Sequence, residues 1–261
     1  MNIDKKYYQE INENLTNTIQ DTNISAPNKK VGKVRDAYFL NDKVVMISTD
    51  RQSAFDRVLA AIPYKGAVLN SVSAWWFKKT EHLFPNHLIS TPDPNVSIVE
   101  KCTVFPVEFV VRGYITGTTD TSLWTVYNNG DREYCGNSLP EGLKKNDRLD
   151  KPMLTPTTKD KVHDRPVSRE EIIDLGLMSA EDYDLAAKMS LDLFAFGQET
   201  AKKNGLILVD TKYEIGTDSK GKIKFVDEIH TPDSSRFWIS SSYKDRINSG
   251  QEPENIDKEF L

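Results

Sequence analysis

The chain has 261 residues, of which 38% are hydrophobic and 28% are charged, and this composition is typical of an ordinary folded protein. With 34 Lys and Arg against 39 Asp and Glu, the formal net charge of −5 argues against a protein devoted to binding nucleic acid. The two cysteines form neither a metal-binding nor a disulfide pattern. The polar first twenty residues are unlike a signal peptide, and no apolar run is long enough to span a membrane, so we expect a cytoplasmic protein.

Hydrophobic spacing predicts the elements of the N-terminal part. Apolar residues recur at helical spacing over residues 4–20 and again over residues 68–79, where two adjacent tryptophans are assigned to the core. Between these helices, residues 34–40 and 43–49 favour β-strands. Asn41 and Asp42 separate the two runs, and such a pair is typical of a hairpin turn.

The remainder of the chain mixes strands, an irregular region and helices. Residues 102–115 predict a strand that is interrupted at Pro106, and residues 128–167 lack periodicity, so we expect a long loop there. Ser168 begins a capping-box pattern, and Ser179 should begin a longer helix. Hairpins with segregated helices favour an α+β fold.

Two β-runs near the C-terminus predict a hairpin that is rich in carboxylates. The runs span residues 206–215 and 222–229. Because strand side chains alternate, Asp210, Lys212 and Glu214 should share one face. A turn centred near residues 218–219 would place Asp227 roughly opposite Asp210. Like charges in these positions destabilise a sheet, so either Lys212 or a divalent cation should offset them, and solvated surface charges are the alternative.

Several further segments combine glycine, cations and hydroxyl groups, which suit anionic ligands. They are Gly32–Asp36, Asp50–Asp56, Arg112–Thr118 and His230–Arg236. Each also has a plainer interpretation as a turn or surface loop. Gly32–Asp36 is not a Walker A loop, because that pattern needs Gly-x-x-x-x-Gly-Lys-Ser/Thr. His163 and Asp164 are adjacent in the sequence, and such a pair is not by itself a catalytic triad.

Taken together, these segments resemble the phosphoribosylaminoimidazole-succinocarboxamide synthase (SAICAR synthetase) family. Val104–Thr118 is similar to the first signature of the family, and Leu208–Gly216 is similar to the second. Thr118 stands where the family commonly has Ser, and Ile215 stands where it commonly has Phe. The segment 155–159 and the C-terminal tail resemble the longer, fungal-type branch.

The resemblance implies a two-lobed α+β fold, with a kinase-like N-terminal lobe over residues 1–103 and an ATP cleft between the lobes. Residues 104–261 would form the second lobe, with the metal and substrate sites. The implied reaction joins L-aspartate to the carboxylate of the imidazole nucleotide CAIR with ATP and Mg²⁺, through an acyl phosphate, as a step of purine biosynthesis. A small-molecule carboxylate kinase and a non-catalytic nucleotide-binding module are the alternatives.

The resemblance also implies a role for individual residues. Those expected to bind ATP are Lys33, Arg35, Lys101, Cys102, Val104 and Glu214. Mg²⁺ would be held by Glu214 and Asp227. The substrates would be bound by Asp50, Ser53, Arg112, Thr118, Lys159, Asp164, Ser235, Arg236 and Arg246, and the reacting centre would be lined by Asp210, Lys212 and Asp233. The expected partners are CAIR, aspartate and ATP, with no nucleic acid and no membrane, and the chain would be a monomer or a small homo-oligomer.

Overall fold

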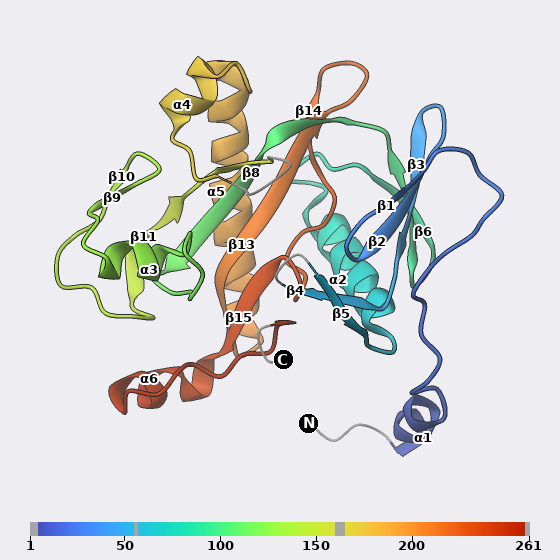
Figure 1. Ribbon diagram of the computed structural model, residues 1–261, viewed down its shortest axis with the longest axis horizontal. Helices are drawn as coiled ribbons and strands as arrows, with labels where there is room; N and C mark the ends of the chain where they lie inside the picture. Colours follow the sequence, from blue (N-terminus) through green and yellow to red (C-terminus); the bar gives the residue numbers. More distant parts are fainter. Residues whose placement is uncertain (1–4, 55–56, 160–164, 259–261) are drawn as a thin grey trace. The chain divides into compact units, whose positions relative to one another are not determined.

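The computed structural model describes residues 5–54, 57–159 and 165–258 (Figure 1). The chain divides into two compact units: unit 1 comprises residues 1–78 and 87–101, and unit 2 comprises residues 79–86 and 102–261. Antiparallel sheets are combined with helices along the chain, and this confirms the α+β class. No helix in the described part of the chain is both long enough and apolar enough to cross a membrane.

Unit 1 is built on a five-stranded antiparallel sheet in the order β1-β2-β3-β7-β6. Its strands are β1 (Lys29–Val31), β2 (Arg35–Phe39), β3 (Lys43–Ser48), β6 (Leu88–Asp93) and β7 (Val96–Glu100), with a separate hairpin of β4 (Arg51–Ala54) and β5 (Arg57–Ala61). The predicted hairpin is therefore confirmed as β2 and β3. Two helices, α1 (Lys5–Glu13) and α2 (Lys65–Thr80), belong to this part of the chain, although the last two residues of α2 are counted in unit 2.

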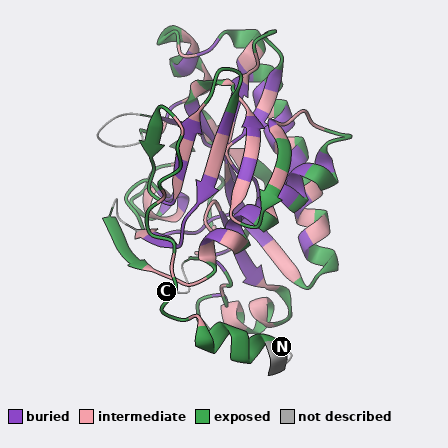
Figure 2. Cartoon of the chain, turned by 90° about the vertical axis from the view of Figure 1, so that its right-hand side faces the viewer, coloured by how far each residue is buried: buried purple, intermediate pink, exposed green. Residues whose placement is uncertain are grey.

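Two expectations for the N-terminal helices need correction. The first helix ends at Glu13 and does not reach residue 20, because a turn follows over residues 14–16 and the Ile19 and Thr22 N–H groups donate to Asp50 and Asp36 and not to helical carbonyls. Residues 7–13 of α1 are exposed (Figure 2). The tryptophans of α2 also differ from each other, since Trp76 is 6% exposed and Trp75 is 49% exposed. Adjacent helical residues point about 100° apart, so one apolar face cannot bury both.

Unit 2 contains an antiparallel sheet whose main strands run in the order β11-β8-β13-β14, with β12 beside β8 and β15 beside β13. The strands are β8 (Thr103–Tyr114), β11 (Arg148–Leu154), β12 (Thr157–Thr158), β13 (Leu206–Thr217), β14 (Ile223–Val226) and β15 (Ser235–Ile239). The helices are α3 (Leu123–Asn128), α4 (Arg169–Asp174), α5 (Ala180–Lys203) and α6 (Ser240–Asn248). Long α5 runs along β8 and β13 (Figure 1), and the Phe109 and Tyr183 rings lie 5.7 Å apart between helix and sheet.

Strand β8 passes through Pro106 without interruption, contrary to the sequence prediction. The pairing of β8 with β13 shifts at this point, because Glu214 lies opposite Glu108 whereas Gly216 lies opposite Val104. Proline has no N–H to give to a regular ladder, and the irregular register accommodates it. The Pro106 carbonyl still accepts a hydrogen bond from the Lys159 N–H at 3.1 Å.

The predicted loop over residues 128–167 is also wrong in part. It contains β9 (Glu133–Tyr134), β10 (Asn137–Ser138), β11 and β12, and the last two pair with β8. An apolar cluster holds this region in place, formed by Ile115, Leu123, Tyr127, Tyr134, Leu139 and Leu149. Strands of two residues are too short to show an alternating pattern, so periodicity could not reveal them.

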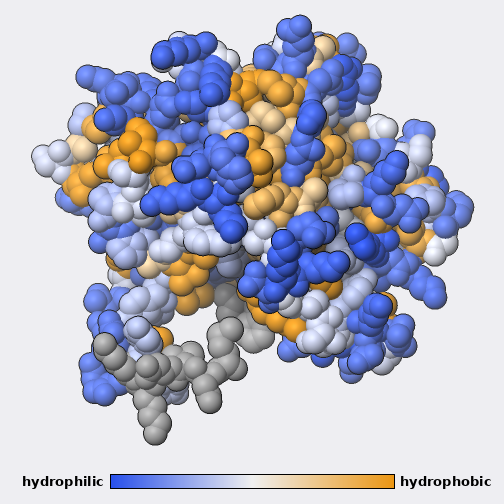
Figure 3. All heavy atoms as spheres, turned by 180° about the vertical axis from the view of Figure 1, so that it is seen from behind, coloured by the Kyte–Doolittle hydropathy of each residue, from blue (hydrophilic) through white to orange (hydrophobic). Residues whose placement is uncertain are grey.

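The predicted helix signals of unit 2 are confirmed. The Ser168 hydroxyl accepts the Glu171 N–H, and the Glu171 carboxylate accepts the Ser168 N–H, which is a complete capping box. Ser179 caps α5 in the same way. Hydrophilic side chains cover much of the face shown in Figure 3, as expected for a chain in which 28% of residues are charged.

Candidate functional site

One face of the unit 2 sheet gathers charged side chains on adjacent strands. The register places Arg112 opposite Asp210 and Glu108 opposite Glu214, with Lys212 between them. Directly opposite residues of an antiparallel pair point to the same side, so these five side chains share a face. Helix α5 covers the other side, where the side chains of alternate residues pack against it. We call the five residues and Arg236 of β15 the charged face.

The first half of the charged face is basic. The Asp210 carboxylate accepts a hydrogen bond from Arg236 at 2.5 Å and lies 3.9 Å from the Arg112 guanidinium. Arg112 is oriented by a hydrogen bond from its Nε to the Thr155 hydroxyl at 2.9 Å. Two guanidinium groups around one carboxylate leave a surplus positive charge, and the planar fork of arginine suits a phosphate or carboxylate ligand.

The second half of the charged face consists of Glu108, Lys212 and Glu214, and Lys159 lies beside it. Lys212 Nζ donates to Glu108 at 2.7 Å and lies 3.9 Å from Glu214, while Lys159 forms an ion pair with Glu214. Burial raises the pKa of Glu214, Asp227 raises it further, and the two lysines oppose the rise. Burial lowers the pKa of Lys212, but Glu108 and Glu214 outweigh this effect and hold the pKa above its ordinary value.

The predicted opposition of Asp227 and Asp210 is wrong. Glu214 pairs with Val226, so Asp227 comes next to the Glu214 end of β13, whereas Asp210 lies opposite Arg236 and Arg112. The cause is the turn, which is closed by a hydrogen bond from the Asp218 N–H to the Lys222 carbonyl and is therefore centred later than expected. The acid–acid neighbours are Glu214 and Asp227, and Lys159 and Lys212 offset the Glu214 charge; of these two lysines, the sequence predicted Lys212 alone.

Glu214 and Asp227 also have the chemistry to hold a magnesium ion. Mg²⁺ prefers hard oxygen donors and commonly takes one or two carboxylates together with substrate phosphates. No three of the His, Cys, Asp and Glu side chains within the described ranges come together as a metal-binding group. The donor set therefore fits an ion that arrives with a phosphate ligand and does not fit an all-protein metal cage.

The segment after β14 is shaped by Thr231. Its hydroxyl donates to the Glu228 carboxylate at 2.8 Å and accepts the N–H groups of Asp233 and Ser234. Ser235 then begins β15, and its buried hydroxyl is 2.7 Å from the Thr211 hydroxyl. Of this segment, Arg236 lies opposite Asp210 and joins the charged face, whereas Ser235 lies opposite Thr211 and points to the other side of the sheet. Asp233 lies in the turn just before β15.

A buried tyrosine–histidine pair supports the same segment from the helix side. Tyr213 Oη lies 2.5 Å from His230 Nε2, and both residues are almost fully buried. Burial lowers the pKa of His230 to about 3 and raises that of Tyr213 well above its usual value, so both are neutral near pH 7. Sequence reasoning assigned no role to this pair or to Glu108. The position of Glu108 opposite a charged residue of β13 would have been the signal, once the register was known.

Unit 1, taken by itself, contains a tight turn between β1 and β2. The Gly32 N–H donates to the Arg35 carbonyl at 2.7 Å, and a Cβ at Gly32 would lie 2.8 Å from that oxygen, so only glycine fits. Lys33 is exposed at the turn, and Arg35 follows on β2. The turn thus presents cations beside closely approachable backbone, which is suited to a phosphate ligand.

Asp50 and Ser53 differ in their surroundings. Asp50 is 3% exposed, and its two oxygens accept the N–H groups of Ile19 and Gly66, at 2.8 and 2.9 Å. These bonds give it a structural role at the start of α2. Ser53 is half-buried on β4.

The remaining predicted residues lie at several places in the fold. Lys101 donates its N–H to the Asp42 carbonyl, Cys102 is half-buried, and Val104 is 40% exposed at the start of β8. Thr118 is exposed after β8. Arg246 lies on α6, where its Nε donates to the Glu252 carbonyl at 2.6 Å. His163 and Asp164 lie outside the described residues.

Comparison with known proteins identifies the family. The family model described as SAICAR synthetase matches residues 28–261. A phosphoribosylaminoimidazole-succinocarboxamide synthase of Legionella pneumophila (strain Lens) is 58% identical over 243 residues, which are 93% of this chain and 78% of that protein. The chloroplastic enzyme of the same name from Vigna aconitifolia is 56% identical over 252 residues, which are 95% of this chain and 74% of that protein.

A solved structure agrees with these relatives. The SAICAR synthase of Saccharomyces cerevisiae complexed with SAICAR matches with a TM-score of 0.76 and 33% identity, covering 86% of this chain and 81% of that one. By fold and by sequence, the chain is a ligase with an α+β architecture. It belongs to the SAICAR synthetase family.

The expected fungal-type branch is not supported. The relatives at 56–58% identity are bacterial and plant proteins, whereas the yeast structure is 33% identical. The segment 155–159 and the C-terminal tail, which resemble the fungal-type branch, therefore do not indicate a fungal enzyme.

Proposed function

We propose how the residues of the two units divide the work of this family's reaction. The chain is an ATP-dependent ligase that joins L-aspartate to the carboxylate of CAIR, giving SAICAR, ADP and phosphate in purine biosynthesis. The observation that carries the assignment is the charged face, in which Arg112 and Arg236 lie beside a row formed by Glu108, Lys212 and Glu214. Such a row can hold anionic substrates and stabilise charge during phosphoryl transfer.

The basic half is proposed to hold CAIR. Arg112 and Arg236 would grip its phosphate and carboxylate, and the nearby Ser235 and exposed Thr118 would add hydroxyl hydrogen bonds. Asp210 would hold both guanidinium groups in position before the anion binds. The yeast relative was solved with SAICAR, a ligand that carries the same nucleotide portion.

The nucleotide is proposed to be bound by Glu214 and Asp227 in unit 2 and by the turn between β1 and β2 in unit 1. Lys33 and Arg35 would contact ATP phosphates, and the backbone from Lys101 through Cys102 to Val104 would contact adenine. Glu214 and Asp227 would hold Mg²⁺, which when bound supplies positive charge to the phosphates. We propose that residues 1–103 form the nucleotide-binding lobe and that residues 104–261 form the lobe with the metal and substrate sites.

The reacting centre is proposed to lie where the two halves of the charged face meet. Lys212, held by Glu108, would stabilise charge on the phosphoryl group as it passes to the CAIR carboxylate. The aspartate amine would then attack the acyl phosphate and expel phosphate. Asp233 would orient the reacting groups. The amine attacks in its neutral form, and we assign no dedicated general base to this step.

The remaining assignments are less central to the reaction. Lys159 and Asp164 are proposed to bind the aspartate substrate, and Ser53 and Arg246 retain their predicted substrate roles. For Asp50 we favour an indirect role, since both of its oxygens already accept backbone N–H groups. A location in the cytoplasm and a monomer or small homo-oligomer stay predictions from the sequence.

The test is a product assay with isotopically labelled aspartate. The labelled SAICAR mass should appear only when CAIR, ATP, Mg²⁺ and aspartate are all present. Family membership does not favour the two alternatives, and the assay separates them from the ligase. Phosphate transfer at an equal rate without aspartate would indicate a kinase, and nucleotide binding without any turnover would indicate a non-catalytic module.

A further inference from the structure

Segment 19–22 precedes the part of the chain that matches the family model, which begins at residue 28. It is nevertheless tied to the core of unit 1. The Ile19 N–H donates to the Asp50 carboxylate at 2.8 Å, and the Asp50 N–H donates to the Ile19 carbonyl at 2.8 Å. Thr22 donates to Asp36 through its hydroxyl at 2.7 Å and through its N–H at 3.2 Å. The segment is therefore an ordered part of the lobe.

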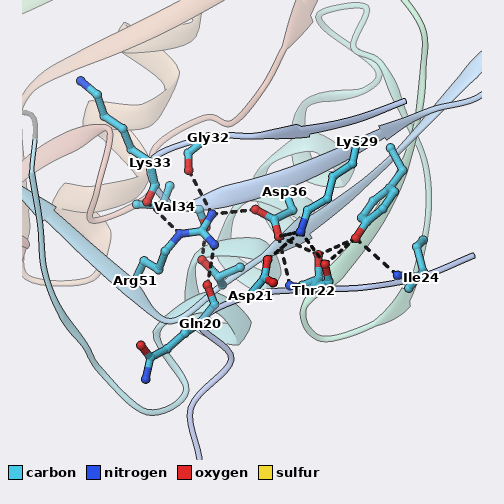
Figure 4. Close-up of polar contacts among 12 residues, drawn as sticks. Gln20, Asp21, Thr22, Ile24, Lys29, Gly32, Lys33, Val34, Asp36 and Arg51 are labelled. Atoms are coloured by element: carbon cyan, nitrogen blue, oxygen red, sulfur yellow. Dashed lines mark hydrogen bonds and ion pairs between the residues drawn. The ribbon is translucent and has the colours of Figure 1, made fainter. Parts of the chain in front are cut away.

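Arg51 connects this segment to the glycine turn. Figure 4 shows its guanidinium between the segment and the turn, where it donates to four acceptors. They are the Gly32 carbonyl at 3.0 Å, the Lys33 carbonyl at 3.2 Å, the Gln20 carbonyl at 2.6 Å and the Asp36 carboxylate at 2.8 Å. Arg51 is 8% exposed and Asp36 is fully buried, so the ion pair is shielded from solvent. Lysine, with one nitrogen, cannot reproduce this planar set of donors.

The consequence for the turn is electrostatic. Carbonyl oxygens of a turn repel a phosphate, whereas its N–H groups and cations attract one. Arg51 donates hydrogen bonds to the Gly32 and Lys33 carbonyls. The Thr49 N–H and hydroxyl donate to the Val34 carbonyl at 2.9 and 2.8 Å. Three successive acceptors are thus directed toward protein donors. Lys33, by contrast, is exposed at the same turn, and its side chain points away from the Arg51 guanidinium (Figure 4).

The charge of Asp36 is secured from several sides, which keeps Arg51 in place. Burial alone would raise its pKa, but hydrogen bonds from Thr22, Arg51 and Lys29 outweigh this and lower it. Tyr38 adds a hydrogen bond to the Thr22 carbonyl at 2.8 Å. The segment and the ion pair therefore form one connected network beneath the turn.

We propose that segment 19–22, with Asp36 and Arg51, is a positioning element that holds the Gly32–Val34 turn in its nucleotide-binding conformation. Arg51 acts through the turn and is a positioning residue, since it contacts the turn's backbone and not the phosphate itself. The inference rests on the proposed role of Lys33 and its turn in nucleotide binding. It extends that site to a segment outside the family match.

The test compares Arg51→Lys with Arg57→Lys, a matched control at an exposed position of the neighbouring β5. The measurements are the Kd of ADP by calorimetry, amide hydrogen exchange over residues 32–35, and the KM values of all three substrates. Arg51→Lys should exchange faster in the turn and weaken ADP binding about tenfold, while the KM values of CAIR and aspartate change less than about twofold. Arg57→Lys should match the unsubstituted protein.

A second variant keeps the proposal testable if Arg51→Lys does not fold. Thr22→Val removes one hydroxyl bond to Asp36 and should weaken ADP binding about threefold, with faster exchange in the turn. Unchanged ADP affinity in a folded variant whose turn exchanges faster would overturn the proposal. Lys33→Met tests the underlying site separately: unchanged ADP affinity there would overturn the nucleotide role of the turn, whatever Arg51→Lys shows.

Discussion

Replacing Gly197 with alanine should destabilise the protein, although the same change stabilises most helices. Gly197 lies inside α5, where the helix meets the buried pair of Tyr213 and His230. A Cβ at this position would lie 2.4 Å from His230 Cε1 and 2.8 Å from Leu208 Cδ2. Both distances are far below an ordinary van der Waals contact, and both neighbours are buried. Either the helix or the His230 segment must therefore move.

The magnitude follows from two opposing effects. Alanine in a helix interior is favoured over glycine by roughly 0.5–1 kcal/mol. Overpacking a well-filled core typically costs about 1–3 kcal/mol. We expect a net decrease of about 1–2 kcal/mol in the free energy of unfolding, which corresponds to a Tm lower by about 2–8 °C for a chain of this size.

Urea unfolding and thermal melting followed by circular dichroism would measure this change. Ala195, which is exposed on the same helix, supplies the control. Ala195→Gly should lower stability by roughly 0.5–1 kcal/mol, as propensity alone predicts. Because the His230 segment leads to Asp233 and Arg236, Gly197→Ala should also lower kcat. A Gly197→Ala protein that is more stable and fully active would refute the close packing on which the reasoning depends.

Three further outcomes are expected. Burial lowers the pKa of His230 to about 3, so the unfolded chain binds more protons between about pH 3 and 6.5 and stability falls as the pH drops through this window. Unfolding measured at pH 7.5 and 5 should show that His230→Gln removes about 2 kcal/mol of this loss, and an unchanged pH slope would contradict the buried neutral histidine. Glu108→Gln should lower kcat about ten- to hundredfold through Lys212, with the KM of CAIR little changed, and steady-state kinetics with an unaltered kcat would exclude this positioning role. Asp227→Asn should raise the Mg²⁺ concentration that gives half-maximal activity about tenfold or more, without loss of thermal stability, and an unchanged titration would remove Asp227 from the metal site.

Local signals in the sequence were sufficient for many elements. The capping box at Ser168 and the cap at Ser179 each depend on residues within one turn, and both helices begin where these residues indicate. The hairpin around Asn41 and Asp42 is equally local. The clustering of Asp210, Lys212 and Glu214 on one face followed from strand alternation alone.

Other features depend on contacts that are distant in the sequence. The predicted register of the last hairpin failed because the turn is centred later than assumed, and this shift places Asp227 beside Glu214 and not beside Asp210. The β-strands at residues 148–154 and 157–158 are stabilised by their pairing with β8, and not by their own pattern. The conformation of segment 19–22 depends on its contacts with Arg51, Asp36 and Asp50, which are distant in the sequence.

The most direct test of the account is a crystal structure with CAIR, ADP and Mg²⁺ bound. We predict that the CAIR phosphate and carboxylate contact Arg112 and Arg236, and that the metal ion is held by Glu214 and Asp227. Lys159 should then leave its ion pair with Glu214. Ligands bound elsewhere, with the ion pairs of the charged face unchanged, would contradict the account.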